Sequence, residues 1–165
     1  MKKILIFLFI AVSFVATACA SGNLDSSIAS DELSSSTNAN QTKGSVTKVK
    51  IFVNEKTLYA TFDDNATSRA IIAQMPMTLK MLDLYGDEMC YRYPNELPID
   101  DVKSYVHKKG EIFYWPPRHS FVIRYVATTE ELEIQHVGQI DSGVEIFNGI
   151  GDVDVKFEVV ADTSR

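Results

Sequence analysis

Residues 49–62 read VKIFVNEKTLYATF, and this stretch decides which kind of fold the chain can adopt. Apolar residues occupy every second position over 49–53 and again over 58–62. A period of two is typical of a strand that buries one face. Residues 54–56, Asn-Glu-Lys, separate the two runs and supply a polar turn. The stretch therefore predicts an antiparallel hairpin at the start of the folded part.

The same alternation recurs along the rest of the chain. It predicts further strands over 77–84, 89–93, 111–115, 121–126, 132–140 and 152–160. A cluster of N-cap residues, 63–65, precedes apolar residues near helical spacing, so we expect one main helix over 66–75, ended by Pro76. An irregular connection is expected over 94–106, where two prolines occur, and a short helix or turn over 141–150.

Eight or so short strands, one main helix and a short second helix predict a mainly β fold. Short strands of this number favour a small β-barrel, closed or nearly closed, because closure removes the unpaired edges of the sheet. We place this domain at residues 46–160, followed by a short tail over 161–165.

The N-terminus indicates export. Two lysines precede an apolar run, 4–16, that is too short to span a bilayer. Small residues then lead to Cys19, and this ending resembles the lipobox of bacterial lipoproteins. The resemblance implies a signal peptide over 1–18 and lipidation of Cys19. The alternative is an ordinary secretory signal that is cut after an Ala-x-Ala site.

Residues 20–45 are rich in serine, asparagine and threonine and contain no aromatic residue. Such a segment cannot bury enough apolar surface to offset its ordering entropy, so we expect a disordered tether after Cys19. The chain would then be an extracytoplasmic protein that is lipid-anchored to the cell-envelope membrane.

Charge excludes one class of partner. The full chain has 16 basic and 22 acidic residues, and removal of 1–18 would take away two lysines and no acid. The mature chain would carry a net charge of −8. We therefore expect no nucleic-acid partner, because phosphates require a basic face, and we expect membrane contact only through the N-terminal lipid.

Several stretches carry a family resemblance when they are taken in order. These are NEKTLYATFDDNATSRAIIAQMPMTLKMLDLYGDE at 54–88, KKGEIFYWPPRHSFVIRY at 108–125, HVGQID at 136–141 and GIGDVDVKFEV at 149–159. Together they resemble the bacterial cyclophilin-like domain family over nearly all of 46–160. The resemblance implies a small cyclophilin-like β-barrel.

It does not imply an activity. Catalytic cyclophilins resemble one another in a Phe-His-Arg strand and a Gln-Gly-Gly-Asp stretch, and neither string occurs here. Arg92 and Arg124 are the basic residues nearest to such a role, and we expect both to be solvated side chains on outward strand faces. No catalytic residue can be assigned.

Other chemistry finds little support in the sequence. The three histidines lack metal-ligand spacing, so we expect no metal site, and no motif indicates a cofactor. Cys90 is the one thiol left beside the lipidated cysteine, and its apolar strand predicts a buried, inert side chain.

Aromatic residues give the one candidate site. Tyr114 and Trp115 are neighbours on a strand and must point to opposite faces, so both cannot be buried in one interior. Tyr114 continues the alternation of Ile112 and is the better candidate for the inward position. We predict a ligand site at the outward face, with these candidate residues: Trp115, Tyr93, Phe113, His119 and Arg118.

Two classes of function stay open. The first is a binding module that holds an unidentified peptide or small ligand outside the cytoplasm. The alternative is an enzyme, a peptidyl-prolyl cis-trans isomerase with a diverged site.

Overall fold

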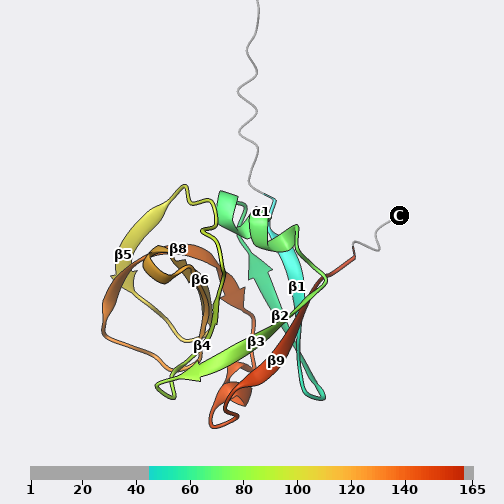
Figure 1. Ribbon diagram of the computed structural model, residues 1–165. Helices are drawn as coiled ribbons and strands as arrows, with labels where there is room; N and C mark the ends of the chain where they lie inside the picture. The colour runs from blue at the N-terminus through green and yellow to red at the C-terminus, as the bar shows by residue number, and fades with distance from the viewer. Residues whose placement is uncertain (1–44, 162–165) are drawn as a thin grey trace, which may run out of the picture. The chain divides into compact units, whose positions relative to one another are not determined.

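A computed structural model describes residues 45–161 of the chain (Figure 1). The expected signal peptide, Cys19 and the tether lie outside the described residues. The described part is mainly β, with nine strands, one α-helix and two 3₁₀ turns. Of the helices over 45–161, none is long and apolar enough to cross a bilayer.

Of the nine strands, all except β5 match the alternating runs of the sequence. The strands are β1 (Thr47–Val53), β2 (Lys56–Phe62), β3 (Met77–Leu84), β4 (Glu88–Arg92), β5 (Val102–Val106), β6 (Glu111–Trp115), β7 (Ser120–Arg124), β8 (Glu131–Ile140) and β9 (Val153–Val159). The helix α1 (Ala66–Ile72) lies between β2 and β3, and the 3₁₀ turns are η1 (Pro116–Arg118) and η2 (Val144–Phe147).

All strand pairs are antiparallel, and the sheet closes on itself. The order is β2-β1-β9-β3-β4-β7-β6-β8, and β2 pairs again with β8. This makes the closed barrel of eight strands that the sequence predicts. Gly138 lies at the closing seam, where an added Cβ atom would be 2.3 Å from the carbonyl oxygen of Thr61. Glycine is therefore required for the two strands to approach this closely.

The interior of the barrel is filled by one face of each strand. The fully buried residues with the largest side chains include Phe62, Tyr114, Phe121 and Phe157. Helix α1 adds Ile71 to this core. The N-cap of α1 is Asn65, whose Oδ1 accepts a hydrogen bond from the Ser68 backbone N–H at 2.8 Å. The helix is shorter than the predicted range of 66–75.

One expectation about the elements is wrong. The connection over 94–106 is not irregular throughout, because Val102–Val106 form β5, which pairs with the first half of β8. Strand β5 is not part of the closed barrel but extends the sheet beyond β8, on the side away from β6 (Figure 1). A second, smaller apolar cluster forms there, outside the barrel, and includes Cys90, Phe113, Val122 and Ile134.

Candidate functional site

The candidate site lies on the outer face of the barrel, over β4, β7 and β6. Strand alternation determines which side chains reach it. Ile112 and Tyr114 point into the core, as predicted, and Tyr114 is fully buried. Phe113 and Trp115 consequently point outward. Trp115 is half-buried, at the edge of a pocket.

Three rows of side chains form the floor of this pocket. The register places Glu88 opposite Arg124 in the first row. Cys90, Val122 and Phe113 form the middle row, and Arg92, Ser120 and Trp115 form the third. The floor therefore changes from charged to apolar and back to charged along the direction of the strands.

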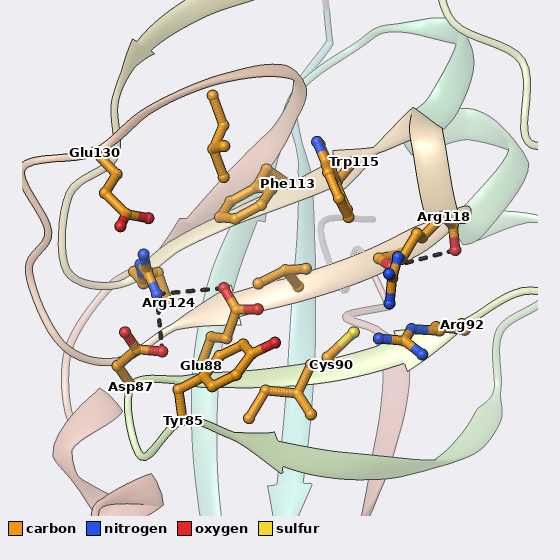
Figure 2. Close-up of a pocket in the computed structure, with 14 residues that line it drawn as sticks. Tyr85, Asp87, Glu88, Cys90, Arg92, Phe113, Trp115, Arg118, Arg124 and Glu130 are labelled. Carbon is orange, nitrogen blue, oxygen red and sulfur yellow. Dashed lines mark hydrogen bonds and ion pairs between the residues drawn. The ribbon is translucent and has the colours of Figure 1, made fainter.

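The pocket has a volume of about 260 Å³. Its walls come from the β3–β4 turn, from η1 and from the start of β8 (Figure 2). Its lining residues are Leu84, Tyr85, Asp87, Glu88, Cys90, Arg92, Phe113, Trp115, Arg118, Ser120, Val122, Arg124, Glu130 and Leu132.

The β5–β8 extension explains why an outward-facing Phe113 is buried. His107, which follows β5, stacks on the Phe113 ring with centroids 4.6 Å apart. His107 is almost fully buried, and neither ring nitrogen has a hydrogen-bond partner within residues 45–161. Burial lowers the pKa of His107, and the nearby Arg124 guanidinium lowers it further. The imidazole is thus a neutral packing group behind the pocket.

Arg124 is not solvated, so the expectation for this residue is wrong. Its side chain is only 4% exposed. Its Nη1 donates to Glu88 Oε2 at 3.2 Å and lies 3.0 Å from Asp87 Oδ1 as an ion pair, without the alignment of a hydrogen bond (Figure 2). The Nε of Arg124 is buried and has no hydrogen-bond partner among the described residues. A buried donor without an acceptor costs about 1–3 kcal/mol.

Glu88 is the partner that stabilises Arg124 most directly. Burial raises the pKa of Glu88 above its usual value, and the Arg124 guanidinium opposes this effect. Asp87 and Glu130 raise the pKa of Glu88 as well, which shows how closely three carboxylates gather at this end of the pocket.

The opposite end of the pocket holds two other arginines. Arg92 on β4 and Arg118 in η1 are both exposed, and Figure 2 shows their guanidinium groups at the same end. Neither forms an ion pair with any residue of 45–161. The turn that presents Arg118 is held by Ser120 Oγ, which donates to the Arg118 carbonyl at 3.2 Å.

Two residues near the pocket adopt left-handed backbone conformations. Tyr85 has a φ of 61° and His119 a φ of 49°. Residues other than glycine, asparagine and aspartate rarely adopt this conformation. Those that do occur more often at functional sites than elsewhere. Tyr85 is also 89% exposed at the rim of the pocket. A strained, exposed aromatic residue at a pocket rim is suited to contact a bound molecule.

The thiol of the pocket floor is not set up for reaction. Cys90 is buried as predicted, and burial raises the pKa of its thiol, so the reactive thiolate is disfavoured. Within 45–161, no group of three or more histidine, cysteine, aspartate or glutamate side chains could hold a metal ion.

The structure brings together three of the five residues predicted from the sequence. Trp115, Phe113 and Arg118 line the pocket. Tyr93 instead points into the barrel core, and His119 ends the η1 turn without lining the pocket. Sequence reasoning missed the charged rows. The signal that could have revealed the charged rows is the alternation along 88–93. One face carries Glu88, Cys90 and Arg92, and the other carries Met89, Tyr91 and Tyr93.

Comparisons with known proteins agree with this architecture. A family model described as the cyclophilin-like family matches residues 51–159. Among solved structures, a hypothetical protein of Archaeoglobus fulgidus, known from its solution structure, is similar with a TM-score of 0.57 and 16% sequence identity. The match covers 73% of this chain and 99% of that one, and at this identity it shows a shared fold alone. No curated protein matches the chain.

Proposed function

The chain belongs to the cyclophilin-like family, and from this premise we propose that its outer pocket binds a peptide or a small ligand with an apolar body. The observation that carries the proposal is the apolar middle row of the pocket floor, Cys90, Val122 and Phe113, which lies between two charged rows. A ligand with an apolar body would cover this row, and its polar groups would meet the charged rows on either side. Pockets that combine apolar surface with a few directed polar groups are typical binding sites.

The aromatic residues support the same function. Trp115 is half-buried at the edge of the pocket. Phe113 lies in the pocket floor, and its ring stacks on His107. Rigid aromatic surface binds apolar groups at little cost in conformational entropy. Trp115 lies outside the barrel core and packs against the outer cluster at the edge of the pocket.

We further propose that this binding takes place outside the cytoplasm, on a lipid anchor at Cys19. The support is the N-terminal sequence, with its basic start, its short apolar run and the cysteine that follows small residues.

The test uses the single tryptophan of the chain as the reporter. The full-length chain is titrated with terminally blocked apolar tetrapeptides, and we expect a saturable change in Trp115 fluorescence. Val122→Phe places a larger side chain in the middle row of the pocket floor and should abolish the change. Val106→Phe makes the same substitution at an exposed position of β5 and serves as the control.

Thermal melts of both variants establish that they are folded. A fluorescence change that persists in folded Val122→Phe would place the binding site elsewhere and contradict the proposal. The absence of any change with the wild-type chain would contradict it as well.

A further inference from the structure

The charges of the pocket are separated into two ends. At one end, Asp87, Glu88 and Glu130 face the single cation of Arg124, which leaves an excess of carboxylates. At the other end, Arg92 and Arg118 line the pocket without an ion-pair partner among residues 45–161. Figure 2 shows the two groups at opposite ends of the apolar middle row.

The local structure keeps the two arginines together. Arg92 pairs with Ser120 across the β4–β7 ladder, and Ser120 Oγ bonds to the Arg118 carbonyl. In addition, the Tyr93 N–H donates to the His119 carbonyl at 2.9 Å and ties the end of β4 to the same turn. Two neighbouring guanidinium groups repel each other, and a carboxylate placed between them would remove that repulsion and accept charge-assisted hydrogen bonds.

The distance between the two ends follows from the strand geometry. Glu88 and Arg92 are four residues apart on β4. At a rise of about 3.3 Å per residue, the acidic row and the basic row are about 13 Å apart. An extended chain of about four residues spans this distance. Its apolar side chains would lie over Val122, Phe113 and Trp115.

We propose that the pocket selects an extended apolar peptide of about four residues that carries an ammonium group at the acidic end and a carboxylate at the Arg92–Arg118 end. The inference rests on the proposed binding function and adds the charge pattern and direction of the ligand. Either the free termini of a short peptide or the side chains of a lysine and an acidic residue within a longer chain could supply the two charges.

The experiment compares four forms of the tetrapeptide Ala-Phe-Leu-Ala on the full-length chain, with Trp115 fluorescence as the readout. The forms have free termini, an acetylated N-terminus, an amidated C-terminus, or both blocks. The free form should bind most tightly, and each block should weaken binding about tenfold, the effect of losing one charge-assisted contact. Higher salt should reduce these differences.

Variants then assign each charge to its end of the pocket. The double variant Arg92→Gln, Arg118→Gln should remove the effect of C-terminal amidation and preserve that of N-terminal acetylation. Arg69→Gln, on the exposed face of α1, is the matched control. Glu130→Gln should reduce the effect of acetylation, and Glu131→Gln, the next residue, should not.

A fifth ligand, blocked Lys-Phe-Leu-Asp, distinguishes the two sources of charge. Binding as tight as that of the free tetrapeptide would assign the charges to side chains within a longer chain, whereas weak binding would assign them to free termini. Both results support the proposed charge pattern.

Other outcomes would overturn the inference. Equal affinity for all four forms would overturn it while leaving the proposed binding function intact. If the arginine variants removed the effect of acetylation instead of amidation, the proposed direction would be wrong. If none of the peptides changed the fluorescence, the binding function and the inference would both fail.

Discussion

Tyr85 shows how a single residue can be kept at a cost to stability. It precedes Gly86 in the three-residue connection (85–87) between β3 and β4, where the Asp87 N–H donates to the Leu84 carbonyl and the two central residues of this turn have positive φ angles of 61° and 70°. Such turns favour asparagine followed by glycine, because asparagine tolerates the left-handed region. A tyrosine in this place is 89% exposed and gains little from burial. Its position at the pocket rim offers a reason for its presence.

We predict that Tyr85→Asn stabilises the fold and weakens ligand binding. The free energy of unfolding should rise by about 1 kcal/mol, since asparagine relieves the strain of the left-handed conformation. Affinity for the tetrapeptide should fall, because the rim loses an aromatic contact. Urea unfolding and the Trp115 titration measure the two effects separately.

The control is Tyr59→Asn, which changes an exposed tyrosine on β2 with ordinary strand geometry. This variant should show neither the gain in stability nor the loss of affinity. Unchanged affinity in Tyr85→Asn would remove the functional explanation for the strained tyrosine.

The residues of the site differ in how far the sequence could predict them. Trp115, Phe113 and Arg118 lie close together in the sequence. Strand alternation alone predicts that Phe113 and Trp115 face outward while Tyr114 faces the core. Arg124 could not be interpreted in this way, because its partner Glu88 is 36 residues away and becomes a neighbour only through the β4–β7 register. A charged residue on a strand carries no local signal that another strand will bring it a partner.

At the level of elements, the barrel strands were predictable and β5 was not. Strands such as β1 alternate between buried and half-exposed residues, so their sequences have a clear period of two. Strand β5 has the sequence VKSYV, and four of its five residues are exposed. It forms because β8 is long enough to pair beyond the barrel, and this long-range condition is absent from the segment itself.

The β5–β8 extension covers the outer cluster and creates a dependence on pH. His107 is buried in this extension without a hydrogen-bond partner in the described part of the chain, and burial lowers its pKa below the ordinary value of 6.5. Arg124 acts in the same direction, whereas Glu111 and Glu130 oppose it. The unfolded chain therefore binds a proton more readily at His107 than the folded chain does. This contribution to stability is complete above about pH 6.5 and is lost as the pH falls below it.

We predict that His107→Phe reduces the loss of stability between pH 7 and pH 5. Phenylalanine keeps the stacking on Phe113 and cannot bind a proton. Because the raised pKa of Glu88 contributes with the opposite sign, the measured quantity is the difference between the unfolding curves of variant and wild type at each pH. His119→Asn removes a histidine that is not buried and is the control. Parallel curves for wild type and His107→Phe would show that His107 has no such role.

At the level of the whole molecule, the charge of the chain bears on how it would stay at a membrane. The proposed mature chain has a net charge of −8, so an anionic lipid surface repels it. In the proposed lipoprotein, stable attachment would then have to come from acyl chains on Cys19.

We predict that Cys19→Ala transfers the protein from the membrane fraction to the soluble fraction or blocks its maturation. Cys90→Ala is the control, because that thiol is buried in the domain. Fractionation followed by immunoblotting measures the distribution, and mass spectrometry identifies the N-terminus. An unmodified N-terminus downstream of Cys19 in the wild-type protein would contradict lipidation.

Arg92 and Arg124, the basic residues that the sequence places nearest to an isomerase role, have different surroundings in the folded molecule. Catalysis of prolyl isomerisation must lower a barrier of about 18–20 kcal/mol, which requires a group directed at the twisting bond. The charge of Arg124 is engaged by Glu88 and Asp87. Arg92 has no such partner among residues 45–161 and lies beside Arg118, but the Phe-His-Arg pattern of catalytic cyclophilins is absent around it.

We therefore predict that the chain binds proline-containing peptides without appreciable turnover. A protease-coupled assay on a proline tetrapeptide should give a rate close to that of the uncatalysed reaction, while Trp115 fluorescence shows binding of the same peptide. Turnover comparable to that of an active cyclophilin would contradict this prediction. In that case Arg92→Ala and Arg124→Ala would identify the responsible group: loss of turnover with retained binding in one variant would assign catalysis to that arginine.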